Sequence, residues 1–275
     1  MSFPVPSAYT SASNDAQRDE RKRQASPPSF FYAQSQGILT AVRYFDPLHS
    51  GYAGAAGKHK SRMWSALFVQ LMASFEFAMK DFVAQVLDET HIYDDDVKNW
   101  AWLQIDIPTV MSTREGYSRL GAVLIHPLQG WQSPETLNTR YKDIFKREPV
   151  AKSEIQALRD LWVVRHSVAH NGGIVTPPDA RRLRDMSLSD QPVRIDLAYL
   201  EEATAFLRTI VQRLSTVVGP SLLQRWFREA ATGAWTTDEL GYTRVKHITT
   251  WVDSRLRELP TIDEPTYRVD LGAYP

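Results

Sequence analysis

Residues 60–88 read KSRMWSALFVQLMASFEFAMKDFVAQVLD, and this stretch indicates the fold class more clearly than any other part of the chain. Its large apolar residues recur at steps of three, four or seven positions, which places them on one stripe of an α-helix. The stripe comprises Trp64, Phe68, Leu71, Phe75, Met79, Phe82 and Val86. Glu76 lies about 80° from the centre of this stripe, so we expect its carboxylate to have a partner on the flank of the helix.

Helical patterns on both sides of this segment predict an all-α protein. The expected helices cover approximately residues 30–45, 113–125, 133–146, 153–170, 196–218, 222–231 and 237–259. Their starts carry helix-capping signals: Ser133 is followed by Pro134, Ser153 and Glu154 begin a capping box, and Asp196 precedes a long apolar pattern. No alternating pattern typical of a β-strand extends over any length of the chain.

The chain of 275 residues is long enough for one large domain or two small ones. Residues 1–29 are rich in Ser, Ala, Pro and mixed charges, so we expect them to form a flexible tail. We expect residues 30–232 to form the main helical domain, with 94–150 inserted between its longer helices. Residues 233–275 are expected to be a C-terminal helical extension.

The composition excludes several classes of protein. Hydrophobic residues make up 43% of the chain and charged residues 23%, which is ordinary for a globular protein. Lys and Arg number 32, as do Asp and Glu, so an anion-binding surface would have to be a local patch. The lack of cysteine excludes disulfides, thiolate nucleophiles and cysteine-based metal sites. With no secretory signal and no apolar run that could span a membrane, we expect a cytoplasmic protein without membrane partners.

An arginine and a histidine near the end of one predicted helix, Arg165 and His170, are the candidate reactive groups. Three other pairs have a similar spacing, namely Arg43 with His49, Arg119 with His126, and Arg159 with His166. Only Arg165 and His170 combine a long preceding helix, an apolar helix that carries them, and a polar stop at Asn171-Gly172-Gly173. This context, and not the spacing by itself, singles out the pair.

The segment from Arg165 to His170 resembles the HEPN superfamily, whose members are helical and whose nucleases carry Arg-x4-6-His at such a helix end. The resemblance covers approximately residues 60–223 and leaves 94–150 unaligned. It implies an HEPN-like helical bundle and a metal-independent endoribonuclease that uses no cofactor. It also implies RNA as substrate, a homodimer, an antitoxin or other regulatory protein as a partner, and a role as a toxin or in phage defence.

The two residue types suit RNA cleavage by attack of the ribose 2′-hydroxyl on the adjacent phosphate, a nucleophile that DNA lacks. The imidazole of His170 can remove or return a proton near neutral pH. The guanidinium of Arg165 presents a planar fork of donors to phosphate oxygens. On an ideal helix these residues lie about 140° apart around the axis and about 7.5 Å apart along it. We therefore expect that one helix does not easily aim both at one phosphate, and the resemblance implies that Arg165 of one subunit assists His170 of the other.

Further residues are expected to assist this pair. His166 lies one helical turn before His170 and is expected to be a second polar group in the cleft. The resemblance implies that Asn171 orients the imidazole ring and that Glu76 pairs with Arg165 or His170. Phosphate-binding charge around the cleft is expected from Lys60, Arg62, Arg181 and Arg182, although each could equally belong to an ordinary solvated face.

Other interpretations of the same residues stay open. Cationic side chains in a last helical turn stabilise its free carbonyl groups, so Arg165 and His170 could have a capping role only. His166 and His170 have the spacing of a metal-ligand pair without an evident third ligand, which would fit a metal hydrolase. A catalytically silent HEPN-type module for RNA binding or dimerisation is the main alternative. Gly172 stands where some HEPN nucleases carry a tyrosine that accepts adenylyl groups, which argues against that mode of silencing.

Overall fold

The computed structural model describes residues 27–48, 55–89, 92–103, 120–125, 128 and 130–231. The α-helices are α2 (Pro27–Leu48), α3 (Ala55–Glu89), α4 (Asp94–Val97), α6 (Leu120–Ile125), α7 (Pro134–Phe145), α8 (Ile155–His170), α9 (Pro177–Arg182), α10 (Leu197–Arg213) and α11 (Gly219–Ala231). Two 3-10 turns cover Lys152–Glu154 and Met186–Leu188, and a π-helical segment covers Leu214–Val218. Within these ranges there is no β-strand, and the prediction of an all-α protein is confirmed.

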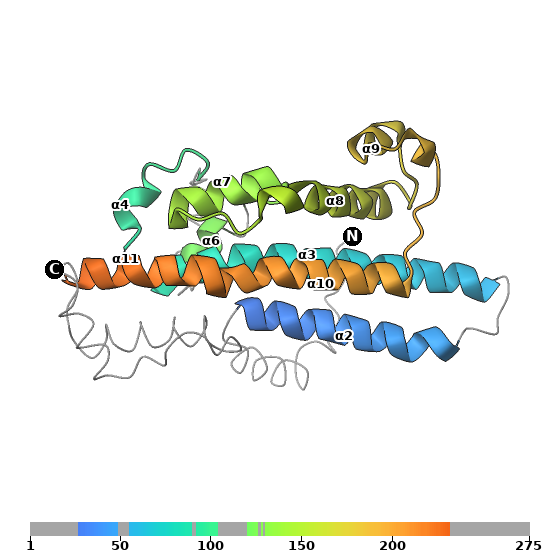
Figure 1. The fold of residues 1–275 in the computed structure, drawn as a ribbon, viewed down its shortest axis with the longest axis horizontal. Helices are drawn as coiled ribbons and strands as arrows, with labels where there is room; N and C mark the ends of the chain where they lie inside the picture. The colour runs from blue at the N-terminus through green and yellow to red at the C-terminus, as the bar shows by residue number, and fades with distance from the viewer. Residues whose placement is uncertain are drawn as a thin grey trace, which may run out of the picture.

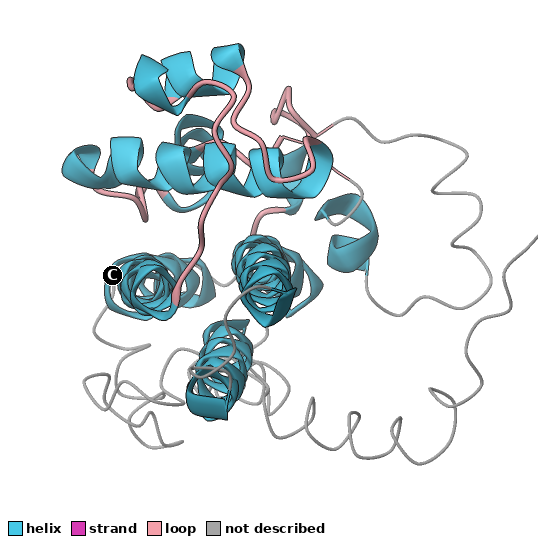
Figure 2. Ribbon diagram, turned by 90° about the vertical axis from the view of Figure 1, so that its right-hand side faces the viewer, coloured by secondary structure: helices cyan, strands magenta, loops and turns pink. Residues whose placement is uncertain are grey.

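The long helices form two layers (Figure 1). Helices α2, α3 and α10 run side by side, and α7, α8 and α9 lie on the side of α3 and α10 that faces away from α2. The view along the bundle in Figure 2 shows α2, α3 and α10 end-on beneath this second layer. The end of α8 and the short helix α9 therefore lie at one end of the upper layer, where the candidate residues are found.

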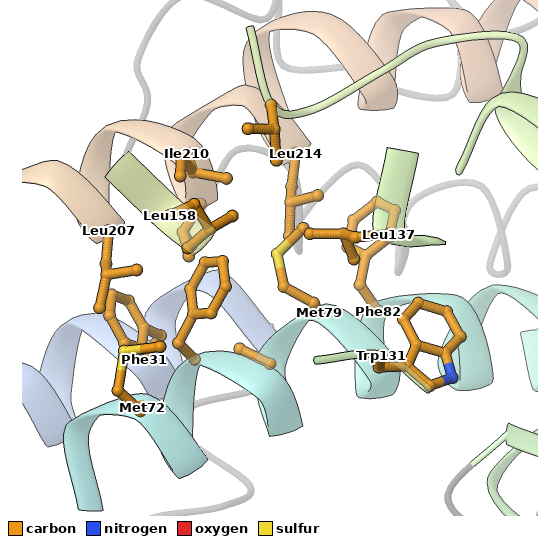
Figure 3. Packing of buried hydrophobic residues seen from close by; sticks show 14 of the residues in the cluster. Phe31, Met72, Met79, Phe82, Trp131, Leu137, Leu158, Leu207, Ile210 and Leu214 are labelled. Atoms are coloured by element: carbon orange, nitrogen blue, oxygen red, sulfur yellow. The ribbon is translucent and has the colours of Figure 1, made fainter. Parts of the chain in front are cut away.

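The core confirms the apolar stripe predicted for α3. All seven stripe residues are at most 2% exposed, and they belong to one cluster that includes side chains of α2, α8 and α10 (Figure 3). The segment expected as an insertion contributes to the same core through Trp131, Leu137 and Tyr141. The hydroxyl of Tyr141 donates a hydrogen bond to the backbone oxygen of Met79 over 2.7 Å. Residues 130–150 are thus part of the packing that supports α3 and α8.

Several helix boundaries agree with the sequence and one capping prediction is wrong. Ser133 caps α7, since its hydroxyl accepts from the backbone N–H of Thr136, and Asp196 caps α10 through the N–H of Tyr199. Ser153 does not cap α8. The carboxylate of Glu154 instead accepts from the backbone N–H of Ala151 over 2.9 Å and also pairs with Arg213, so a tertiary ion pair fixes where this helix begins.

The expected helices over residues 196–218 and 222–231 leave Gly219 and Pro220 between them, and this pair predicts an interruption of the helix. In the structure α10, the π-helical segment and α11 follow one another along one line (Figure 1). Proline has no backbone N–H to donate to the carbonyl group four residues earlier, and its ring clashes with that carbonyl group in a regular α-helix. The wider π-turn before Pro220 relieves this clash. The expected tail over residues 1–29 and the expected helix over 237–259 lie almost wholly or wholly outside the described residues. None of the described helices is long and apolar enough to cross a membrane.

Candidate functional site

The end of α8 forms as the sequence predicts. The backbone N–H groups of Asn171 and Gly173 both donate to the carbonyl oxygen of Ser167, over 3.1 and 3.0 Å. Gly172 and Gly173 have φ angles of 65° and 82°, in the left-handed region where glycine has no steric penalty. The chain therefore turns away directly after His170, and the imidazole is left exposed at the helix end.

Arg165 and His170 meet within one chain. The Nη1 atom of Arg165 lies 3.4 Å from Nε2 of His170. The two groups were expected not to be aimed easily at one phosphate from one helix, and that expectation stays a prediction. The structure shows that the side chains themselves approach each other, because the arginine side chain is long enough to reach along its own helix past one turn. Arg165 is half-buried and His170 is exposed, so the pair lies at the surface of the helix layer.

His166 joins this pair from the preceding turn. Its ring centroid is 5.0 Å from that of His170, and both rings are exposed on one side of α8. The described part of the chain holds no group of three or more histidine, aspartate or glutamate side chains that could bind a metal ion. The structure therefore brings His166 to the candidate site as expected and adds no third ligand to it from the described residues.

A pocket of about 340 Å³ opens between the start of α7 and the middle of α8, and we call it the α7–α8 pocket. It is lined by Gln132, Ser133, Pro134, Glu135, Arg159, Trp162, Val163, Arg165, His166 and Arg182. Trp162 and Val163 are buried and form an apolar part of the lining, while Arg165 and His166 lie on the side toward His170. Arg182 reaches the pocket from α9.

One carboxylate in this pocket is already neutralised. Glu135 forms an ion pair with Arg159 and accepts a hydrogen bond from the Ser133 hydroxyl over 2.7 Å. Partial burial opposes ionisation of Glu135, but the hydrogen bonds from Ser133, from its own backbone N–H and from Arg159 outweigh it and lower its pKa. Glu135 and Arg159 therefore offset each other's charge, and Arg165 and Arg182 are the other two arginines of the lining.

Glu76 does not pair with Arg165 or His170, so that expectation is wrong. Its carboxylate forms an ion pair with Lys80 over 2.9 Å, one turn later on α3, and accepts from the side-chain amide of Gln132 over 3.1 Å. Helical arithmetic correctly places Glu76 on the flank of α3 with a partner. The partner differs because the segment before α7 packs against this flank.

Asn171 does not orient the imidazole ring. Its side-chain amide donates to the carboxylate of Asp179 over 3.0 Å, and the same oxygen accepts from the hydroxyls of Ser167 and Thr176 over 3.2 and 2.9 Å. Asp179 is 2% exposed and joins the end of α8 to the start of α9. We call Asp179 with these three donors the α8–α9 latch.

Asp179 is not among the residues predicted for the site, although the sequence carries a signal for it. Thr176-Pro177-Pro178-Asp179 has the form of a helix start with a capping threonine and an acidic residue three positions later. The structure confirms the cap, because the Thr176 hydroxyl accepts from the backbone N–H of Asp179. Ser167 and Asn171, which complete the latch, come from α8 and its stop, and that pairing follows only from the tertiary fold.

The four expected phosphate-binding cations fall into different surroundings. Lys60 forms an ion pair with Asp46 of α2 over 2.6 Å. Arg62 lines a separate groove of about 640 Å³ between α3 and the loop after α8, and not the α7–α8 pocket. Arg181 is exposed and lines neither of these two cavities, whereas Arg182 lines the α7–α8 pocket. The structure thus gathers Arg165, His166, His170 and Arg182, and leaves the other expected residues apart.

Comparisons of the chain with models of protein families, with curated proteins and with solved structures find no significant match. The function is therefore argued from the residues and the geometry of the site itself.

Proposed function

We propose that this protein is a metal-independent endoribonuclease whose reactive groups are Arg165 and His170. The observation that supports this most directly is the distance of 3.4 Å between Arg165 Nη1 and His170 Nε2 at a solvent-exposed helix end. Cleavage by the 2′-hydroxyl requires a base close to that hydroxyl and a cation close to the adjacent phosphate, so the two groups must lie near each other. The resemblance to the HEPN superfamily supports the same reaction.

The reaction follows from the chemistry of RNA. His170 takes the proton of the ribose 2′-hydroxyl, and the 2′-oxygen forms a bond to the adjacent phosphorus. The bond from phosphorus to the 5′-oxygen of the next nucleotide breaks, and a proton delivered to that oxygen balances the one removed. The products are a 2′,3′-cyclic phosphate and a free 5′-hydroxyl. Arg165 stabilises the charge that builds on the phosphate oxygens in between.

Partners and biological setting are part of the proposal and rest on the resemblance. They comprise RNA as substrate, a homodimer, an antitoxin or other regulatory protein, and action as a toxin or in phage defence. The contact between Arg165 and His170 within one chain means that a dimer is not needed to bring these two groups together. In a dimer each subunit would therefore carry a complete pair.

The test is incubation of purified protein with total RNA in excess EDTA. We expect cleavage that leaves 2′,3′-cyclic ends, no cleavage of single-stranded DNA, and loss of activity by at least about a hundredfold in His170→Ala and Arg165→Ala. Arg181→Ala is the matched control, because this arginine is exposed outside the α7–α8 pocket, and it should retain activity. Binding of RNA without any cleavage would replace the nuclease by a silent binding module. Activity that EDTA abolishes would indicate a metal hydrolase instead.

A further inference from the structure

The α7–α8 pocket has more cationic groups than its own carboxylate can neutralise. Arg159 forms an ion pair with Glu135, whereas Arg165 contacts His170 and forms no ion pair with a carboxylate of the described residues. Arg182 lies 3.5 Å from Asp179, but its side chain is 62% exposed, and a guanidinium has five N–H donors. Most of the donors of Arg182 therefore face water at the mouth of the pocket.

The carboxylate of Asp179 does not close this pocket to anions. It is 3% exposed at the side chain and already accepts from Ser167, Asn171 and Thr176 in the α8–α9 latch. The carboxylate of Glu135 lies toward the start of α7 and is paired there with Arg159. A ligand that enters between Arg165, His166 and Arg182 thus meets donors and cations on its nearest sides.

The α7–α8 pocket lies along α8 on the N-terminal side of His170. His166 lies on the same side of the helix as His170, with 5.0 Å between the ring centroids, and it lines the pocket. Arg165 contacts the His170 ring through Nη1 and also lines the pocket, so this residue is shared by the two places. A strand held at His170 would therefore have its neighbouring backbone group close to His166 and Arg182.

We propose that the α7–α8 pocket binds the RNA phosphate adjacent to the scissile one. The inference rests on the proposed function for the identity of the strand and adds a second phosphate subsite, formed by His166 and Arg182 with Arg165 shared between the two. Arginine forks suit phosphate oxygens, and each phosphate that a cation neutralises releases counterions from the strand. The strand then runs from His170 toward the start of α7.

The test is the salt dependence of binding to a short 2′-O-methyl RNA, which lacks the nucleophilic hydroxyl and cannot be cleaved. For Arg182→Gln we expect binding about fivefold weaker at low salt, and a slope of log affinity against log salt that is smaller by about 0.7 than in the wild type, the value for one single-strand phosphate contact. Arg182→Lys keeps the charge and should keep most of the slope. Arg181→Gln removes the same charge from the next residue of α9, outside the pocket, and should leave the slope unchanged.

The outcomes separate this inference from the nuclease proposal. Equal slopes for Arg182→Gln and Arg181→Gln overturn the second phosphate subsite, whether or not the wild type cleaves RNA. A smaller slope for Arg182→Gln alone supports the subsite even if the wild type cleaves nothing, in which case only the nuclease proposal fails. A hexaglutamate peptide that displaces the RNA at equal concentration, and whose affinity also depends on Arg182, would show that the pocket binds an acidic protein segment and would overturn the inference. Circular dichroism of each variant verifies that the helical fold is retained.

Discussion

The Nη1 atom of Arg165 lies 3.4 Å from Nε2 of His170, and both residues belong to α8 of a single chain. The guanidinium has only N–H donors, so it can hydrogen-bond to Nε2 only where that ring nitrogen accepts. In the proposed reaction, substrate phosphate would compete with the imidazole for the same guanidinium. Displacement of Arg165 toward phosphate would leave Nε2 free to act as a base.

The convergence of both groups in one chain predicts the result of a mixing experiment. We expect an equimolar mixture of Arg165→Ala and His170→Ala proteins to be no more active than the two variants measured separately. If the pair instead formed between subunits of a homodimer, random exchange would restore about a quarter of wild-type activity, because half the dimers would be mixed and each would have one intact pair. RNA cleavage after co-refolding decides between the two arrangements.

The α8–α9 latch predicts a large effect for a small change at Asp179. Asp179→Asn places an amide where three donors converge on one buried oxygen, and we expect a loss of about 3 kcal/mol in the free energy of unfolding. Urea denaturation gives this value. Asp185→Asn is the control, since Asp185 caps a turn in the exposed region after α9, and its effect should be much smaller. Similar losses for both variants would contradict the buried latch.

The ion pair of Glu154 and Arg213 predicts a pH-dependent contribution to stability. The hydrogen bond from Arg213 is the main reason that the pKa of Glu154 is lowered in the folded protein. A lowered folded-state pKa means that the stabilisation is complete above the ordinary carboxyl pKa and is lost as the pH falls through the lowered value. We expect Glu154→Gln to be less stable than the wild type by about 1 kcal/mol at pH 7, and the difference to vanish in strong acid.

Unfolding by urea across this pH range measures that difference. Glu148→Gln is the matched control, because Glu148 forms an exposed ion pair with Lys142, and its effect should stay within about 0.5 kcal/mol at every pH. A Glu154→Gln difference that is the same at pH 7 and in strong acid would mean that packing, and not charge, holds the start of α8.

Two glycines predict opposite effects of the same substitution. Gly172 has a φ of 65° and open space where a Cβ would lie, so Gly172→Ala should cost about 1 kcal/mol through backbone strain and not through a clash. Gly37 lies within α2 with open space and no such φ, and Gly37→Ala should stabilise the protein by about 0.5 to 1 kcal/mol. Thermal denaturation of the two variants should show shifts of opposite sign, and shifts of one sign would contradict this account.

The elements that could be predicted from the sequence are those set by local rules. The α3 stripe follows from helical periodicity, the start of α7 from Ser133 and Pro134, and the end of α8 from two glycines with left-handed backbone. Each signal lies within a few positions of the feature that it determines. Such features need no knowledge of how the helices pack.

The parts that could not be predicted depend on contacts between segments far apart in the sequence. Glu154 accepts from the backbone N–H of Ala151 because Arg213 binds and positions its carboxylate. Glu76 accepts from Gln132 because the segment before α7 packs against α3. The contact between Arg165 and His170 was missed for another reason. Helical arithmetic gives the positions of Cα atoms, and the reach of an arginine side chain is about as long as the axial offset that the arithmetic supplies.

The π-helical segment over Leu214–Val218 determines which way the side chains of α11 point around the helix axis. A wider turn takes up one additional residue, so each later side chain is rotated by about 100° from where uninterrupted α-helical winding would put it. With this offset Leu222 is completely buried, and the guanidinium of Arg225 lies 4.5 Å from the centroid of the Tyr93 ring. Loss of one residue from the segment would restore regular winding and turn both side chains off their targets, so the length of these five residues matters more than their identity.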